Sequence, residues 1–521
     1  MYNWRLIITI AVVTAGASFQ FYSFGAINTP QRIVEGWMNE TYATRYGSPV
    51  SQATLTFLWS FTVGCACIGA IIGSLLTRVL AENCGRKRSL IINGFVTLVG
   101  GGLEASCKAV GSPEMFIIGR LLLGFSNGVA TGMVPLFLTE IAPVERRGAA
   151  GTAHQIVVAF ADWFALLITL PQVLGSESLW PLAFAFPAIP AAALLLVLPF
   201  TEESPRYLLM TKHNREGAKK AVKFYTVSED QYHSMFDGLI VEAAVQSSPS
   251  DNNHWSDFFH KRELRTPLMI SIVVMTAQQF TGCAAVFSYS TNIFVQAELS
   301  QQVAEISTLA IGICYFVFTL PSPYFIEKLG RRKLSLFQLS SCLAFLIILT
   351  IFITLRSRYD LYWASYGSIG ALVAYMCVYG VGSSVPWIIT TELYEQEYRS
   401  FGVAVGTFVA WFWALVVSMG YYPFQRAVGV EFSFLPFIVV LSMSIVGMAM
   451  FLPETKNKTI AEIVKEFRKR KASASMSFGL APHHGKDANG RHPELASLLE
   501  ETGEDEDDRS RNSYQSFSRS G

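Results

Sequence analysis

Twelve long apolar runs, separated by short polar segments, set the strongest limit on how this chain can fold. An α-helix needs about 20 mostly apolar residues to cross the hydrocarbon core of a bilayer. Within that core, only helices and closed barrels satisfy every backbone hydrogen-bonding group. Runs of this length therefore predict an all-α integral membrane protein. We expect spans at 5–27, 53–78, 89–108, 113–139, 149–171, 180–200, 266–294, 304–326, 334–355, 362–390, 400–424 and 432–452.

Composition agrees with a membrane protein and excludes several classes of function. The chain is 51% hydrophobic and only 15% charged, whereas soluble proteins carry about 25% charged residues. A formal net charge of +1 predicts no nucleic-acid partner. The cysteines follow neither a disulfide framework nor a metal-ligand spacing. Because no catalytic nucleophile set, Gly-rich phosphate loop or metal cluster is recognisable, we expect no enzyme, no catalytic residues, no metal and no cofactor.

The two halves of the chain share a short basic motif. Residues 82–88 read Glu-Asn-Cys-Gly-Arg-Lys-Arg, and residues 327–333 read Glu-Lys-Leu-Gly-Arg-Arg-Lys. A motif that returns about half a chain later indicates an internal duplication, and parallel repeats are common in membrane carriers. We therefore predict two six-helix bundles, residues 1–200 and 266–453.

Lysine and arginine gather on one side of the predicted membrane. They occupy the two repeated loops and the central segment, whereas loops 172–179 and 295–303 have none. Basic loops face the cytosol, so both termini are expected there, in a multi-pass protein of the plasma membrane. The longest outside loop, 28–52, contains Asn39 in an Asn-Glu-Thr triplet. Such a triplet is an N-glycosylation acceptor, and we expect a glycan on Asn39.

Two polar segments lie outside the bundles. Segment 201–265 is too short to build much of a core, so we expect short amphipathic cytosolic helices. Segment 454–521 becomes rich in Ser, Gly and His and then acidic, which predicts a mostly disordered cytosolic tail. Within it, Glu494, Leu498 and Leu499 resemble an acidic dileucine signal for a clathrin adaptor. This signal would add an endosomal or lysosomal pool.

Acidic and basic residues recur in matched positions at the predicted cytosolic helix ends. In each half, a glutamate at the end of an apolar run precedes an arginine by seven residues. Arginine–carboxylate pairs are directional, yet an exposed pair contributes only about 0–1 kcal/mol. We expect such pairs to cross the bundle interface and close the cytosolic mouth reversibly; static pairs that only set topology are the alternative. The gate residues are Glu82, Arg86, Glu140, Arg147, Glu327, Arg331, Glu392 and Arg399.

A few polar and aromatic side chains interrupt the spans. Gln155 and Asp162 lie seven residues apart on the fifth span, so they share a helix face. A Gln pair lies on the seventh span, and Gly and Pro beside a Trp imply a broken tenth helix. Amides and aromatic faces suit a polyhydroxylated ring, although each Trp alone also suits packing or a membrane-interface belt. The candidate substrate-binding residues are Gln155, Asp162, Gln278, Gln279, Trp387 and Trp411.

Over about residues 5–468, the chain resembles the facilitative hexose transporters of the major facilitator superfamily, as a divergent member. The resemblance implies a uniporter with alternating access, a substrate bound near mid-membrane, and sugar-binding roles for Gln155, Gln278 and Gln279. The matching motifs are Gly85-Arg86-Lys87, Gly119-Arg120-Leu121, Glu140 with Arg147-Gly148, Glu203-Ser204-Pro205-Arg206, Gln278-Gln279 with Gly282, Gly330-Arg331-Arg332, Pro386-Trp387, Glu392 with Arg399, and Pro453-Glu454-Thr455-Lys456.

The chain also departs from the family at polar positions of the sugar site. The family's asparagine after Gln-Gln is Ala284 here, its eighth-span asparagine is Tyr315, and its tenth-span glutamate is Tyr379. Its eleventh-span asparagines are Ala410 and Ala414. Each buried hydroxyl left unpaired costs about 1–3 kcal/mol, so these changes predict a sugar site with fewer hydrogen bonds.

We expect facilitated diffusion of a monosaccharide or a related polyol. One alternative is a carrier of a different small organic solute, proton-coupled through Asp162. A second is a sensor or scaffold that does not transport. The expected partners are a sugar-like small molecule, the lipid bilayer and the clathrin adaptor.

Overall fold

The computed structural model describes residues 3–143, 147–246, 262–394, 396–456 and 462. Within these residues, twelve helical segments are long and apolar enough to cross a membrane, which confirms the number and order of the predicted spans. The segments are Trp4–Gly25, Gln52–Asn83, Arg86–Val110, Pro113–Ile141, Ala150–Ile168, Trp180–Phe200, Leu264–Gln296, Gln301–Thr319, Arg331–Tyr359, Tyr362–Glu392, Phe401–Val428 and Val430–Phe451. The dileucine residues Glu494, Leu498 and Leu499 lie outside the described part of the chain.

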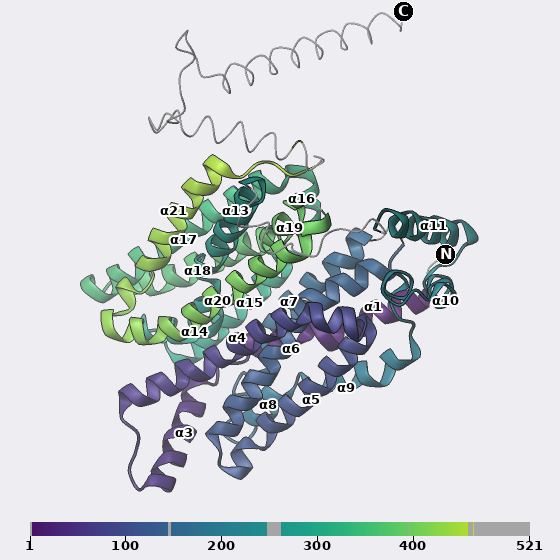
Figure 1. Ribbon diagram of the computed structural model, residues 1–521. Helices are drawn as coiled ribbons and strands as arrows, with labels where there is room; N and C mark the ends of the chain where they lie inside the picture. Colours follow the sequence, from purple (N-terminus) through teal and green to yellow (C-terminus); the bar gives the residue numbers. More distant parts are fainter. Residues whose placement is uncertain (1–2, 144–146, 247–261, 395, 457–461, 463–521) are drawn as a thin grey trace, which may run out of the picture.

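The first bundle packs its helices closely around α4 and α6 (Figure 1). Glycine permits this approach: a Cβ on Gly69 would lie 2.0 Å from the Leu121 carbonyl oxygen, and one on Gly124 would lie 2.0 Å from that of Ala66. Small residues are the usual means of bringing membrane helices together. The spanning helices of this bundle are α1 (Trp4–Ala17), η1 (Ser18–Phe21), α2 (Tyr22–Gly25), α4 (Gln52–Asn83), α5 (Arg86–Val110), α6 (Pro113–Ile141), α7 (Arg147–Ile168), α8 (Trp180–Ala185), α9 (Ala188–Val197) and η3 (Leu198–Phe200).

The second bundle contains three broken spans. Gly282, with a φ of 88°, separates α13 from α14, and Ser383 with Ser384 separates α18 from α19, as the predicted break requires. The eighth span was predicted to reach residue 326, but α15 ends at Thr319 because Pro321 and Pro323 cannot continue it. The elements are α13 (Arg262–Gln279), α14 (Cys283–Gln296), α15 (Gln301–Thr319), α16 (Ser322–Leu329), α17 (Arg331–Tyr359), α18 (Tyr362–Gly382), α19 (Val385–Glu392), α20 (Gln396–Val428), η5 (Val430–Phe432) and α21 (Leu435–Phe451).

Further helical segments lie at opposite ends of the molecule (Figure 1). Helix α3 (Gln31–Tyr46) occupies most of the segment that was predicted to be a loop, and it forms because Val34 and Met38 are buried on one face. The central segment forms η4 (Tyr207–Thr211), α10 (Arg215–Tyr225) and α11 (Glu229–Gln246). We call the end that carries α10 and the two repeated loops the basic end, and the end that carries α3 the far end.

Helices α10 and α11 enclose a small apolar cluster of their own, which includes Val222 and Phe236. They are also tied to the first bundle. The Asn3 side-chain amide donates to the carbonyl oxygens of Phe224 at 3.0 Å and of Thr226 at 3.2 Å. The central segment therefore packs against the basic end of the first bundle.

Candidate functional site

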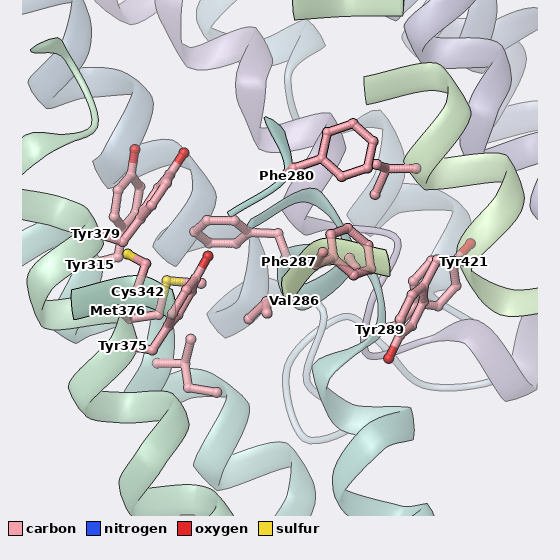
Figure 2. Packing of buried hydrophobic residues seen from close by; sticks show 14 of the residues in the cluster. Phe280, Val286, Phe287, Tyr289, Tyr315, Cys342, Tyr375, Met376, Tyr379 and Tyr421 are labelled. Carbon is pink, nitrogen blue, oxygen red and sulfur yellow. The ribbon is translucent and has the colours of Figure 1, made fainter. Parts of the chain in front are cut away.

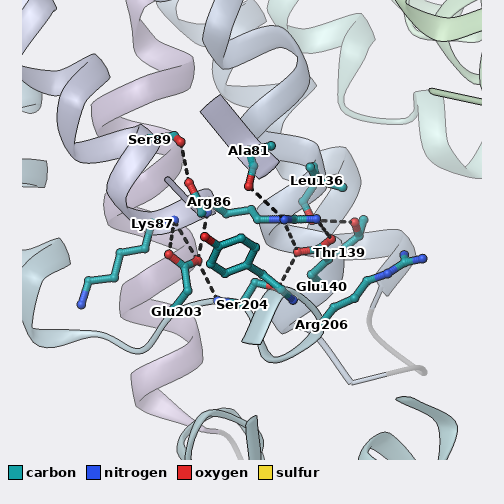
Figure 3. Close-up of polar contacts among 12 residues, drawn as sticks. Ala81, Arg86, Lys87, Ser89, Leu136, Thr139, Glu140, Glu203, Ser204 and Arg206 are labelled. Atoms are coloured by element: carbon teal, nitrogen blue, oxygen red, sulfur yellow. Dashed lines mark hydrogen bonds and ion pairs between the residues drawn. The ribbon is translucent and has the colours of Figure 1, made fainter. Parts of the chain in front are cut away.

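The repeated basic loop begins α5 in the first bundle (Figure 3). Arg86 forms an ion pair with Glu140, its Nε lying 2.9 Å from Glu140 Oε2, and Ser204 donates its hydroxyl to the same carboxylate. Glu203 accepts the backbone N–H groups of Arg86 at 3.1 Å and Lys87 at 2.9 Å. A helix start leaves such N–H groups without partners, and a carboxylate there also favours the helix dipole. Glu203 therefore caps α5.

The second bundle repeats this arrangement at the start of α17, with Thr455 in the place of Ser204. Arg331 Nη2 lies 2.7 Å from Glu392 Oε1, and Thr455 donates its hydroxyl to Glu392 Oε2 at 2.6 Å. Glu454 accepts the backbone N–H groups of Arg331 at 2.8 Å and Arg332 at 3.2 Å. The duplication inferred from two basic loops thus extends to a complete cluster of charged and hydroxyl groups.

Both clusters require glycine at the residue before the arginine. Gly85 and Gly330 have φ values of 91° and 84°, which favour glycine over any residue with a Cβ. A Cβ on Gly85 would lie 2.6 Å from Glu203 Oε2, and one on Gly330 would lie 2.7 Å from Glu454 Oε2. The glycine thus lets the capping carboxylate reach the helix end.

Pairing across the bundle interface was predicted for the gate arginines. This prediction is wrong for Arg86 and Arg331, whose partners the structure shows. Arg86 with Glu140, and Arg331 with Glu392, each lie within one bundle, because each arginine starts a helix next to the one that its glutamate ends. Glu82 instead pairs with Arg78 one helical turn away, at 2.8 Å.

The other predicted gate residues, Glu327, Arg147 and Arg399, are not part of these two clusters. Glu327 and Arg147 are exposed. The side chain of Arg399 lies outside the described part of the structure. The roles of Arg147 and Arg399 therefore stay predictions.

Sequence reasoning missed the capping role of Glu203 and Glu454. Both residues were noted only as parts of motifs, yet each follows the last span of its bundle and precedes Ser204 or Thr455. This shared Glu-Ser/Thr dipeptide is the signal that could have identified them.

Near the middle of the second bundle, Gln278 is the centre of a buried polar network. Its Nε2 donates to the Tyr379 hydroxyl at 3.0 Å and to the Ser383 carbonyl oxygen at 3.3 Å, and its Oε1 accepts from Gln338 at 3.3 Å. Tyr379 in turn donates to the Cys283 thiol at 3.0 Å. Figure 2 shows Tyr379, Tyr315 and Tyr375 as neighbouring rings in this core.

Gln155 connects the first bundle to this network. Its Nε2 donates to the Tyr315 hydroxyl of the second bundle at 3.4 Å. Asp162, on the same face of α7, is only 8% exposed and lies within electrostatic range of Tyr315 and Cys283. In the described part of the chain, its carboxylate has no hydrogen-bond or ion-pair partner. The structure thus brings Gln155, Asp162 and Gln278 into one region between the bundles.

The remaining candidate residues differ in their surroundings. Trp411 is buried and stacks on Phe24 of the first bundle, with 5.5 Å between ring centroids. It therefore packs at the bundle interface. Gln279 and Trp387 are half-buried. No hydrogen bond of their side chains falls within the described residues. Trp413, which was not among the candidates, donates its Nε1 to the Thr276 hydroxyl at 3.0 Å.

Contacts between the bundles concentrate in the middle and at the far end. Asn28, which follows α2, donates its Nδ2 to the Phe287 carbonyl oxygen at 2.6 Å and to the Ser290 hydroxyl at 2.8 Å, and its Oδ1 accepts the Thr291 N–H at 3.2 Å. Nearer the middle, the Cys67 thiol donates to the Ser418 hydroxyl at 3.8 Å. We infer a conformation that is closed at the far end.

Comparison with known proteins agrees with this architecture. The family model described as "Sugar (and other) transporter" matches residues 8–467. The chain belongs to this family. Facilitated glucose transporter member 1 of solute carrier family 2 from Gallus gallus is 33% identical over 473 residues, which cover 90% of this chain and 95% of that protein. Member 4 from Homo sapiens is 33% identical over 472 residues, with 89% and 91% covered.

Solved structures in this comparison share the fold at lower identity. The inward-open conformation of the xylose transporter XylE from E. coli has a TM-score of 0.71 and 19% identity, and covers 88% of this chain and 99% of its own. Its partially occluded inward-open conformation has a TM-score of 0.70, also at 19% identity, and covers 87% and 99%. The chain therefore has the major facilitator fold, and its family consists of transporters rather than enzymes.

As a member of the sugar transporter family, this chain keeps more polarity between its bundles than its sequence departures suggested. Tyr315 and Tyr379 replace an amide and a carboxylate, but their hydroxyls accept from Gln155 and Gln278. Ala410 and Ala414 are buried, and they offer no polar side-chain atom. The hydrogen-bonding groups are therefore changed in kind at α15 and α18 and lost at Ala284 of α14 and at α20.

Proposed function

We propose that this protein carries a monosaccharide across the membrane by facilitated diffusion with alternating access. Its family and the glucose transporters among its relatives support a sugar as the substrate. The observation that carries the proposal is the contact of Gln155 in one bundle with Tyr315 in the other. A substrate that replaces such a contact binds both bundles at once, so its binding energy can drive their relative motion.

The site favours a ring with few charged groups and several hydroxyls. The amides of Gln155 and Gln278 and the phenols of Tyr315 and Tyr379 can both donate and accept hydrogen bonds. Aromatic rings next to them can cover the apolar face of a sugar ring. Gln279, Trp387 and Trp411 are included in the proposed site.

We propose that the basic end of each bundle moves as a rigid unit. Each cluster ties the start of one helix to the end of another within its own bundle, so the basic ends resist deformation as units. Opening and closing would then occur between the bundles, where Arg147 and Arg399 are the proposed contacts. Glu82 and Glu327 complete the proposed gate set, and in this structure Glu82 pairs with Arg78 of its own helix.

Asp162 supports a second candidate function, transport of a solute together with a proton. A carboxylate in a span is expensive to bury, about 2.5 kcal/mol or more, and usually marks a site of function. Asp162 is buried beside Tyr315 and lacks a bonded partner within the described residues. A proton or a donor group of the substrate would satisfy it.

For orientation, we propose that the basic end faces the cytosol and the far end faces outside, with a plasma-membrane location. Asn39 lies in α3, where its Oδ1 accepts the Val50 N–H at 3.0 Å, so its Nδ2 remains available for a glycan. We propose bundles at 1–200 and 266–453, a cytosolic segment at 201–265, and a tail at 454–521 with a clathrin-adaptor signal and an endosomal or lysosomal pool.

Uptake of labelled sugars in cells without their own hexose carriers tests the proposal. We expect saturable uptake of at least one hexose that stops when its concentrations on the two sides are equal. Gln278→Ala should lower its rate at least about tenfold at equal surface abundance. Absence of saturable uptake of every hexose and polyol tested, with the protein at the surface, would reject a sugar substrate.

A further inference from the structure

A polar cavity of about 420 Å³ lies at the far end, between the two bundles. Arg32 and Glu35 of α3 form one wall, and Asn292 and Gln296 of α14 form part of the other. Small-molecule sites usually measure about 300–1,000 Å³. This cavity therefore has room for a ligand of the size of a single sugar, well away from the mid-span site.

The charged groups of the cavity leave it with unused donors for an anion. Its two arginines and one glutamate give a net charge of +1 (2 − 1). Arg426 donates one N–H to the Tyr422 hydroxyl at 2.8 Å, and Glu35 accepts from the Gln31 amide at 2.9 Å. In the described structure, neither Arg32 nor Arg426 lies within ion-pair distance of Glu35. A guanidinium has five N–H donors in a planar fork that matches a carboxylate or phosphate.

A buried amide at the same wall is an independent sign of a missing ligand. Gln425 lines the cavity and is only 1% exposed. Its Nε2 donates to the Tyr421 hydroxyl at 3.4 Å, but its buried Oε1 has no hydrogen-bond partner in the part of the chain that is described. Buried polar atoms are rarely left unsatisfied. Because this oxygen is itself buried, a ligand hydroxyl could donate to it only after the Gln425 side chain turns toward the cavity.

We propose that this cavity binds a small hydroxylated organic anion, such as a sugar acid, and that the bound anion holds the far end closed. The walls come from both bundles, so a ligand in contact with both stabilises the far-end-closed state and no other. A ligand that favours one state shifts the population toward it, and such an anion would slow transport. The binding site is separate from the proposed sugar site and does not depend on the substrate.

Direct binding to the purified chain in lipid nanodiscs tests the site without a transport assay. The probe is labelled D-glucuronate. D-glucose is the control that has the hydroxyls but no charge, and inorganic phosphate is the control that has the charge but no sugar ring. We expect saturable glucuronate binding that excess glucose does not displace. Arg32→Gln and Arg426→Gln should each weaken it about tenfold or more, because each removes a charge-assisted pair.

Arg358→Gln is the matched control. Arg358 is also an exposed arginine at the far end, where it lies 3.4 Å from Glu431, outside the cavity. Its replacement should leave glucuronate binding unchanged. Size-exclusion profiles identify variants that fail to fold. The proposal is overturned if no saturable glucuronate binding occurs, if glucose displaces it, if both cavity variants bind as tightly as the control, or if phosphate binds equally well.

Discussion

Removal of the Glu203 carboxylate should loosen the first bundle at its basic end. In Glu203→Ala, the backbone N–H groups of Arg86 and Lys87 lose their acceptor. Loss of an N-cap costs about 0.5–2 kcal/mol, and a hydrogen bond to a charged group contributes about 1.5–3 kcal/mol. Because the two effects overlap, we expect a loss of about 2 kcal/mol in the free energy of unfolding.

Thermal unfolding of the detergent-purified protein measures this loss. For a folding unit of about 200 residues, 2 kcal/mol corresponds to a decrease in Tm of about 4–8 °C. Glu454→Ala should give a similar decrease, since Glu454 accepts from Arg331 and Arg332 in the same way.

Glu82→Ala is the control for this measurement. Among the residues that the structure describes, the partner of Glu82 is Arg78, and both side chains are more than half exposed. Exposed pairs contribute about 0–1 kcal/mol, so its Tm should change little. If Glu203→Ala and Glu82→Ala unfold at the same temperature, the capping interpretation is wrong.

Three other changes test separate parts of the proposed function. Gln278→Ala, which removes three buried hydrogen bonds, should lower the rate of sugar uptake at least about tenfold; uptake at the wild-type rate would exclude Gln278 from the site. Asp162→Asn should alter the pH profile of uptake or the substrate preference, and an identical profile and preference would remove Asp162 from recognition and coupling. Asn39→Gln should abolish the glycosidase-sensitive gel shift, whereas a persistent shift would reverse the proposed orientation.

The sequence was sufficient for the membrane fold because the fold depends on length and hydropathy. A run such as 432–452 has no stable place other than a bilayer or a protein core, and it corresponds closely to the observed span at Val430–Phe451. Helix α3 was missed because its buried apolar residues form a narrow stripe, with Val34 and Met38 buried and the residues next to them only half-buried. A length criterion for spans does not detect such a helix.

Which residues pair was harder to predict than which residues matter. Arg86, Glu140, Arg331 and Glu392 were predicted to be members of a gate that joins the two bundles, but spacing along the chain does not reveal which helices are adjacent at their ends. The assignment to the bundle interface failed for this reason. Similarly, Tyr315 looked like a lost amide, because only the folded structure shows its hydroxyl within reach of Gln155.

Counterflow in proteoliposomes tests the central claim most directly. Purified protein is reconstituted with unlabelled hexose inside, and a trace of labelled hexose is added outside with no proton or ion gradient. Alternating access predicts transient accumulation of label above its external concentration, because each outward trip with unlabelled sugar returns a site for a labelled one. Sugar binding without any transient accumulation would contradict the account.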